Sequence, residues 1–406
     1  MDAPQLRRDI QMIPATALGR RVIAFLDPYH LVDSTIALDM RLLPILRLLD
    51  GTHTLRDIQM VFIRNQGGHL VSLSEVKAFL DGLDRAFLLK SPLFEESVRS
   101  LYEEFKRQEK RHPVHAGASY ESNPEGLRQS IEETESALLP DKVGEVDEHI
   151  TGIVAPHIDI RVARSTYVNL YRTLKGRHYD VVVIFGINHQ MQDGLYSVSD
   201  KDYITPFGTI RTDRSFIAEL KEGLPRGTLA TDDFGHKAEH SIEFQTVFLH
   251  HYLGESLTIV PILCGGIHEF LYDKKNIFED ERFLSMAERI DGLIKERGGN
   301  VLIVAGVDFS HVGPKFGHET TAHDILPRAA SNDELILSLL AQGKSEDIFQ
   351  NAMETQDQYN VCGLPALLMC SRLLSEGMGR LLSYDTYNEE ATGSAVTYAS
   401  MIFAGR

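Results

Sequence analysis

The sequence predicts an α/β protein, in which a three-layer α/β/α domain with a mixed sheet follows a small helical, winged-helix-like domain. Three observations support this prediction. The chain has 406 residues, which is enough for two or three domains. Short helical patterns fill residues 1–95. From residue 113 onward, continuous apolar runs alternate with amphipathic helical patterns, as expected for a sheet covered by helices on both faces.

The first region predicts three helices and a small strand. The helical patterns span residues 41–51, 54–68 and 72–91. Thr54 and Ser74 carry side chains that favour helix N-caps. Residues 87–90 are apolar, and we expect them to form a short strand. Three helices with a small ribbon indicate a winged-helix-like module over residues 1–95.

Residues 96–112 are dominated by charges and hold few aromatic side chains. We therefore expect a solvated linker helix between two folding units. The second unit then spans residues 113–406.

The alternating patterns of the second unit predict its strands and helices. The predicted strands span residues 149–156, 181–186, 257–263, 300–307, 380–387 and 395–403. The predicted helices include residues 215–224, 238–253, 283–299, 333–343 and 365–377. Residues 204–213, ITPFGTIRTD, have the pattern of an inserted antiparallel hairpin.

Composition excludes some classes of function. The net charge of −17 argues against a general nucleic-acid-binding protein, which needs a basic face. No apolar run approaches the ~20 residues of a membrane span, and the N-terminal segment lacks the apolar stretch of a signal peptide. The three cysteines have neither a disulfide-framework pattern nor zinc-ribbon spacing, so we expect a cytoplasmic protein.

Polar residues follow several predicted strands. His157 and His189 each come directly after an apolar run, and Asp308 and His311 follow a third in the motif VDFSH. Ligands of open α/β sheets bind outside the carboxyl ends of parallel strands. Neutral imidazole binds Fe, Cu and Zn, so these histidines are candidate metal ligands. For any one of them alone, a surface or turn position is the more common alternative.

Two further segments add candidate residues. In EHSIEFQ, His240 and Glu243 are three residues apart and share one side of a predicted helix, as in some metal sites or in an ordinary helical pair. Cys362 precedes Pro365 at the start of another predicted helix. A thiolate is stabilised at a helix N-terminus, which suits a metal ligand or a nucleophile, whereas buried free cysteine is the inert alternative.

These segments together resemble the Memo-like family, whose bacterial and archaeal members are often labelled AmmeMemoRadiSam system protein B. The resemblance rests on HPVHAGASYESNPEGLRQSIEE, APH, GINH, EHSIEFQ, VDFSH and VCGLPALL, which occur in this order from about residue 113 to the C-terminus. The family is similar in fold to class III extradiol dioxygenases, which hold non-haem Fe(II) with two His and one Glu. The resemblance therefore implies a Memo/extradiol-dioxygenase-like α/β/α domain.

The resemblance also implies roles for particular residues. His157, His189 and Cys362 match the two histidines and the cysteine of the family's pocket. His240, Glu243, Asp308 and His311 match other pocket residues, which would act as acid/base groups or orient the ligands. This chain reads PHIDI where many members read PHAGY, so Asp159 is a possible additional pocket residue.

The first region more weakly resembles the PqqD-like winged-helix modules, through Asp27-Pro28 and the motif DGT-x-T-L at residues 50–55. Such modules bind peptides that radical-SAM partner enzymes modify.

Two hypotheses for function follow. The first is a metal-dependent, possible dioxygenase-like redox enzyme of unknown substrate, with Fe(II) as the expected metal and Cu or Zn as alternatives. The second is a non-catalytic adaptor that binds a peptide or a radical-SAM protein in a vestigial pocket. A thiol hydrolase using Cys362 is a further alternative.

Overall fold

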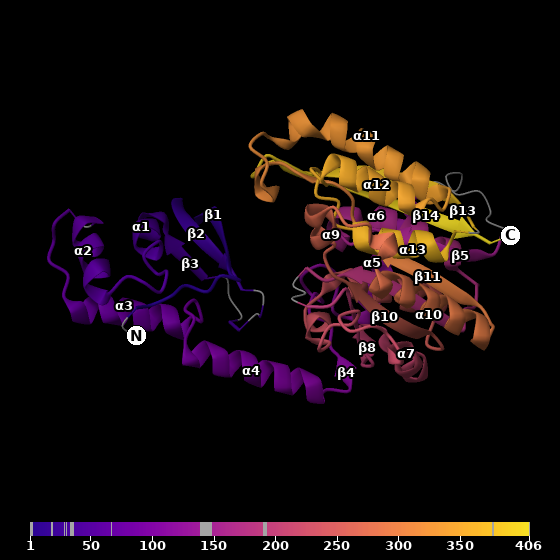
Figure 1. The fold of residues 1–406 in the computed structure, drawn as a ribbon, viewed down its shortest axis with the longest axis horizontal. Coiled ribbons are helices and arrows are strands. Elements are labelled where there is room, and N and C mark those ends of the chain that lie inside the picture. The colour runs from indigo at the N-terminus through magenta and orange to yellow at the C-terminus, as the bar shows by residue number, and fades with distance from the viewer. Residues whose placement is uncertain are drawn as a thin grey trace. The chain divides into compact units, whose positions relative to one another are not determined.

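The computed structural model describes residues 3–17, 19–27, 29, 31–32, 36–65, 67–138, 148–189, 193–375 and 377–405. The chain divides into two compact units, Met1–Arg107 and Gln108–Arg406 (Figure 1). The division falls inside the predicted linker region. Pro28 of the Asp-Pro motif lies outside the described residues.

The first unit is a small domain with an antiparallel three-stranded sheet followed by helices. The strands are β1 (Gln11–Ala17), β2 (Arg20–Leu26) and β3 (Ile36–Asp39), in the order β1-β2-β3. The helices are η1 (Met40–Leu42), α1 (Leu43–Leu46), α2 (Leu55–Asn65), α3 (Leu73–Arg85) and α4 (Pro92–Arg107). Buried side chains such as Ile23, Ile45 and Leu80 join sheet and helices in one core.

Three details differ from the sequence prediction. The sheet precedes the helices, whereas residues 87–90 form no strand and contribute only an isolated bridge between Leu89 and Leu6. The N-cap of α3 is Ser72, not Ser74. Ser72 is the favoured N-cap because Glu75 lies three residues further on, and the two side chains form a capping box. The expected linker helix corresponds to α4, which ends at Arg107.

The second unit is built on a large mixed sheet, in which eleven strands can be followed through the described residues. The strand order is β12-β14-β5-β11-β6-β10-β9-β8-β4, with β13 on β14 and β7 on β10. The strands are β4 (Lys110–Arg111), β5 (Ile150–Ala155), β6 (Val181–Ile187), β7 (Tyr196–Val198), β8 (Asp202–Thr205), β9 (Gly208–Thr212), β10 (Thr258–Cys264), β11 (Val301–Gly306), β12 (His311–Val312), β13 (Met378–Glu389) and β14 (Ser394–Ala404). Strands β5, β11, β6 and β10 run parallel, and β8 and β9 form the predicted antiparallel hairpin.

Helices cover both faces of this sheet. They are α5 (Pro124–Ala137), α6 (Ile160–Tyr171), α7 (Arg214–Lys221), α8 (His240–Leu253), α9 (His268–Asp273), α10 (Glu281–Arg297), α11 (Ala322–Ala341), α12 (Ser345–Thr355) and α13 (Leu364–Leu373). Alternate strand residues enter two separate cores. Val183 and Phe185 of β6 pack in the core that includes α10 and α13, and Val182 and Ile184 pack in the core that includes α6 and α8. Burial on both faces explains why these strands are continuous apolar runs in the sequence.

Glycines in two parallel strands let helix α8 lie close to the sheet. A Cβ added at Gly186 of β6 would lie 2.5 Å from the Ser241 hydroxyl, and one at Gly306 of β11 would lie 2.5 Å from the Ser241 carbonyl oxygen. The Ser241 hydroxyl instead donates to the Ile187 carbonyl at 3.1 Å. This contact places the N-terminus of α8 beside the carboxyl ends of β6 and β11. Among the described residues, no helix is both long and apolar enough to cross a membrane.

Candidate metal centre

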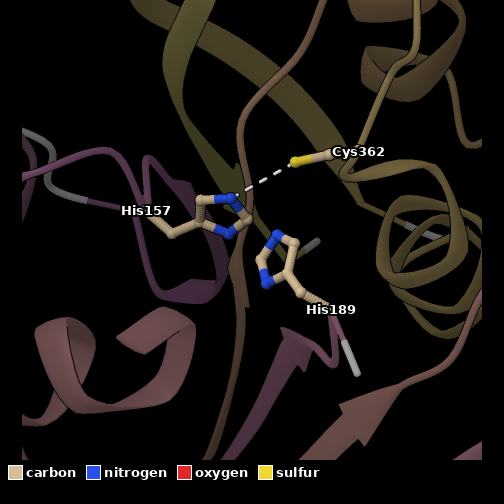
Figure 2. A group of neighbouring side chains, drawn as sticks. All are labelled: His157, His189 and Cys362. Carbon is tan, nitrogen blue, oxygen red and sulfur yellow. Dashed lines mark hydrogen bonds between the residues drawn. The ribbon is translucent and has the colours of Figure 1, made fainter. Parts of the chain in front are cut away.

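Two histidines and one cysteine meet at the carboxyl ends of the parallel strands. His157 follows β5, His189 follows β6, and Cys362 lies two residues before the first residue of α13, separated from it by the N-cap Gly363. One ligand atom from each of the three lies within 4.8 Å of the others. Figure 2 shows both imidazole rings and the Cys362 sulfur turned toward one another. The fold thus brings together residues that are up to 205 positions apart in the chain.

His157 is buried and held on two sides. Its backbone N–H donates to Asp308 Oδ1 at 2.9 Å, and its Nδ1 lies 3.1 Å from the Gly306 carbonyl oxygen. Because a carbonyl only accepts, Nδ1 carries the ring proton and Nε2 has a free lone pair. Nε2 lies 3.2 Å from the Cys362 sulfur. Burial, together with the neighbouring His240 and His189, lowers the pKa of His157 well below its ordinary value, so the ring is neutral.

Cys362 is positioned by an unusual loop. Gln356, Asp357 and Asn360 have φ values of 52°, 45° and 50°, the left-handed region that non-glycine residues seldom adopt. Asp357 accepts a hydrogen bond from the Val361 backbone N–H at 2.9 Å, one residue before the cysteine. Burial and the nearby Asp308 raise the pKa of the Cys362 thiol well above its ordinary value. Without a metal the side chain is therefore a thiol, which argues against an activated thiolate nucleophile.

Glu239 joins His189 to His240. The carboxylate is the N-cap of α8 and accepts from the backbone N–H groups of His240 and Ser241 at 2.9 and 3.1 Å. It also lies 3.0 Å from His189 Nδ1 and 3.1 Å from His240 Nδ1. Burial opposes ionisation of Glu239, but His189 and His240 outweigh it and hold the pKa well below the ordinary value. For His189, the loss of solvation lowers the pKa, but the Glu239 carboxylate raises it by more, so the pKa of His189 is raised overall.

His189, Glu239 and His240 form a second set in which one possible ligand atom of each residue lies within 4.8 Å of the others. Hydrogen bonding decides between the two donor sets. Both Glu239 oxygens already accept from backbone N–H groups of α8 or His189, and binding a metal would leave those buried donors unpaired. Cys362 and His157 offer atoms with no such competing backbone donors. The two-His, one-Cys set is therefore the better metal site.

Asp308 and His311 lie beside this set. Asp308 Oδ1 accepts from the backbone N–H groups of His157 and Ile158, and Oδ2 lies 3.6 Å from His157 Nε2. Burial raises the pKa of Asp308 to about 6 despite these hydrogen bonds. His311 Nδ1 lies 3.0 Å from the Phe309 carbonyl oxygen, and burial lowers the pKa of His311 to about 4. The loop that follows β11 thus holds the backbone at His157 and Ile158 through Asp308.

Glu243, in contrast, does not contact the site histidines' rings. Its carboxylate pairs with Arg111 and accepts from Tyr120 Oη at 2.6 Å and from the backbone N–H groups of Val114 and His115 at 3.0 and 2.9 Å. We expected Glu243 to orient a histidine or to exchange protons. The structure gives the orienting contact to Glu239, because the N-terminus of α8 faces the pocket while Glu243 faces residues 111–120.

Asp159 makes hydrogen bonds and an ion pair to nearby residues that have structural roles. It is the N-cap of α6 and accepts from the Arg161 backbone N–H at 2.8 Å, and its other oxygen accepts from Ser119 Oγ at 2.9 Å. Its carboxylate also pairs with the Arg161 guanidinium. The expectation of an additional ligand or base is not supported by these contacts, since they occupy both oxygens.

Glu239 and Arg111 were missed in the sequence. Glu239 stands inside EHSIE, directly before a predicted helix, where a side-chain acceptor is a capping signal, although Ser, Thr, Asp and Asn are the usual residues. Arg111 lies in a charged segment that resembles a solvated linker, and its burial has no local signal in the sequence.

The fold and the cluster define an α/β protein with a histidine- and cysteine-rich site at the carboxyl ends of parallel strands. The profile of the family described as Memo-like protein matches residues 111–402, and the chain belongs to this family. A MEMO1 family protein of Aquifex aeolicus is 34% identical over 367 residues, covering 89% of this chain and 91% of the relative.

Archaeal relatives match only part of the chain. MEMO1 family proteins of Methanosarcina barkeri and Methanopyrus kandleri are 29% and 27% identical, and each match covers 72% of this chain and 99% or 98% of the relative. The matched lengths, 298 and 306 residues, are close to that of the unit Gln108–Arg406.

Proposed function

We propose that the second unit binds a redox-active metal through His157, His189 and Cys362 and acts as a metal-dependent redox enzyme. Fe(II) is the proposed metal and Cu the redox-active alternative, whereas Zn would fit the same ligands but has no redox chemistry of its own. The observation that carries the proposal is the convergence of three donor atoms, within 4.8 Å of one another, at the carboxyl ends of parallel strands. The fold similarity to extradiol dioxygenases stays a prediction and adds to the proposal without testing it.

The donor set fits such a metal. Nitrogen and sulfur ligands lie about 2.0–2.3 Å from a bound ion, so two ligands of one ion are at most roughly 4.6 Å apart. The three donor atoms all lie within 4.8 Å of one another, and Cys362 Sγ and His157 Nε2 are 3.2 Å apart, so small side-chain movements would bring all three onto one ion. Two neutral imidazoles with one thiolate suit Fe(II), Cu(I) and Zn, whereas Mg and Ca prefer oxygen ligands.

When bound, Fe(II) would supply redox chemistry with dioxygen at coordination positions that three protein ligands leave open. The remaining work belongs to the chain itself. The His240 ring centroid lies 5.1 Å from that of His157 and 5.3 Å from that of His189, close enough for His240 to accept or deliver a proton at the substrate. Asp308 fixes the backbone of His157 through two N–H groups. His157 is buried, Cys362 is half-buried and the His189 side chain is 41% exposed, so the site is open to solvent on the His189 side.

Metal content tests this proposal. Protein produced and purified without oxygen should contain close to one equivalent of Fe, Cu or Zn, measured by elemental analysis. Cys362→Ala and His189→Ala should lose most of it while their circular dichroism spectra stay unchanged. His178→Ala is the matched control, because His178 is mostly exposed and pairs only with Asp180. Equal metal content in all four proteins, or none in any of them, would rule the proposal out.

The second candidate function is a peptide- or protein-binding adaptor. The observation that favours it is the first unit, a separate compact unit that precedes residues 111–402, which the family profile matches. A radical-SAM protein or its peptide substrate is the proposed partner. Titration of the full chain with such a protein separates the two functions, because an adaptor binds equally well when Cys362 is replaced by Ala.

A further inference from the structure

One buried carboxylate faces the Nδ1 atoms of two site histidines. Glu239 Oε2 lies 3.0 Å from His189 Nδ1, and Oε1 lies 3.1 Å from His240 Nδ1. The two rings are nearly parallel, with an interplanar angle of 12° and centroids 5.3 Å apart. A single side chain therefore sets the orientation of both rings.

We propose that Glu239 is a positioning residue that holds His189 and His240 as Nδ1–H tautomers, so that both Nε2 atoms are free of protons. A carboxylate only accepts hydrogen bonds, so the ring nitrogens that face it must carry the protons. For His189 the free Nε2 is then the atom available to a metal, and this half of the inference rests on the proposed function. For His240 the free Nε2 is a proton acceptor. His157 and His311 have the same tautomer, set by the carbonyl oxygens of Gly306 and Phe309.

Glu239 is itself held rigidly. Its Oε1 accepts from two backbone N–H groups at the start of α8, and its carbonyl oxygen accepts from the Arg111 guanidinium at 2.9 Å. The residue is 8% exposed. The two oxygens are held unequally, because Oε1 accepts from two backbone N–H groups at 2.9 and 3.1 Å, whereas Oε2 accepts from one, that of His189, at 3.3 Å.

This asymmetry makes Glu239→Gln informative. The amide oxygen of Gln should stay on the two shorter bonds, from the N–H groups of His240 and Ser241, so the amide NH₂ takes the place of Oε2, gives up the 3.3 Å bond from the His189 backbone N–H and faces His189 Nδ1. Two donors cannot share a hydrogen bond, so His189 should switch to the Nε2–H tautomer. His240 keeps an oxygen neighbour and should retain its Nδ1–H tautomer.

The test uses metal-free full-length protein labelled with ¹⁵N at histidine. Two-bond ¹H–¹⁵N correlation spectra report the tautomer of each ring, and His189→Ala and His240→Ala identify the two signals. The wild type should show the Nδ1–H pattern for both residues. An Nε2–H pattern for either residue in the wild type would overturn the proposal, and this measurement needs no Glu239 variant to fold.

Fe(II) titration under anaerobic conditions provides the second readout. Loss of a residue that orients a ligand typically weakens metal affinity by about 10–100-fold, and we expect this for Glu239→Gln. Glu243→Gln is the matched control, because Glu243 lies in the first turn of the helix that Glu239 caps, is also buried and pairs with Arg111, yet faces away from the rings. It should lower stability but leave the tautomers and the Fe(II) affinity unchanged.

The outcomes also separate this inference from the proposed function. Nδ1–H tautomers without Fe, Cu or Zn binding would support positioning by Glu239 and reject the metal site. Metal binding with an Nε2–H tautomer at His189 or His240 would support the metal site and reject positioning by Glu239. Equal loss of Fe(II) affinity in Glu239→Gln and Glu243→Gln would reduce Glu239 to a purely structural role and contradict the proposal.

Discussion

Arg111 and Glu243 form an ion pair in which each side chain is only 1% exposed. The Arg111 guanidinium also donates to the carbonyl oxygens of His236 and Glu239, at 3.0 and 2.9 Å. Arg111 stands on β4, close to the start of the larger unit, whereas Glu243 and Glu239 belong to EHSIE. The pair therefore connects β4, near the start of the larger unit, to helix α8, whose first residue is the site histidine His240.

Replacing Arg111 should destabilise the larger unit strongly. Arg111→Ala leaves the Glu243 carboxylate buried without its cation, and loss of one partner of a buried pair costs about 3–5 kcal/mol. Urea unfolding followed by circular dichroism measures the change. Arg161→Ala is the control, since its pair with Asp159 is largely exposed, and it should have little effect. Similar midpoints for the two variants would contradict the importance of the buried pair.

The same pair predicts how stability depends on pH. Burial opposes ionisation of Glu243, but Arg111 and the surrounding donors outweigh it, so the native pKa is lowered. A lowered native pKa contributes stability that is fully present above the unfolded-chain value of about 4.3 and is lost as the pH falls below it. The difference in unfolding free energy between wild type and Glu243→Gln should be constant from pH 7 to 5 and shrink toward pH 3. A difference that does not change over this range would show that folding does not lower the pKa of Glu243, and one that grows toward pH 3 would show that folding raises it.

Much of the larger unit was predictable from the sequence, because its strands are buried on both faces and its helices on one. The strand-end residues His157, His189 and Asp308 could be found for the same reason, since parallel strands bring their carboxyl ends to one edge. The grouping of Cys362 with the two histidines came from the family resemblance. Local periodicity does not report contacts between residues that lie more than a hundred positions apart.

The missed features share this origin. Arg111 contacts Glu243 across 132 positions, so nothing near it in the chain signals its burial. Strand β1 was missed because almost all of its side chains are exposed, which leaves no alternation of apolar and polar residues to detect. The sequence favoured Glu243 over Glu239, because residues spaced i and i+3 on a helix share one face and Glu243 has this spacing from His240. Glu239 lies just outside the helix as its N-cap, where no such spacing relates it to His240.

The close approach of α8 to the sheet predicts intolerance at Gly306. A Cβ there would lie 2.5 Å from the Ser241 carbonyl oxygen and 2.7 Å from Gln245 Nε2. Gly306→Ala should therefore destabilise by about 1–3 kcal/mol and disturb the His240 signals in NMR spectra. Gly292→Ala, inside α10 with no atom within 4 Å of the added Cβ, should instead stabilise by about 0.5–1 kcal/mol. Equal effects of the two substitutions would argue against tight packing at Gly306.

The larger unit should fold and bind metal without the first unit. Archaeal relatives align over nearly their full length with 72% of this chain, which is about the size of the unit Gln108–Arg406. A protein beginning at Gln108 retains Arg111, and we expect a single cooperative thermal transition and the metal content of the full chain. Aggregation, or loss of metal under conditions in which the full chain retains it, would show that the site depends on residues 1–107.

X-ray absorption spectroscopy of anaerobically prepared, Fe(II)-loaded protein tests the two-His, one-Cys centre most directly. The spectrum should require one sulfur ligand at about 2.3 Å together with nitrogen ligands at about 2.0–2.1 Å, close to the distances known for zinc. In Cys362→Ala the sulfur contribution should disappear. A wild-type spectrum fitted by nitrogen and oxygen ligands alone, or a sulfur contribution that survives in Cys362→Ala, would contradict the proposed centre.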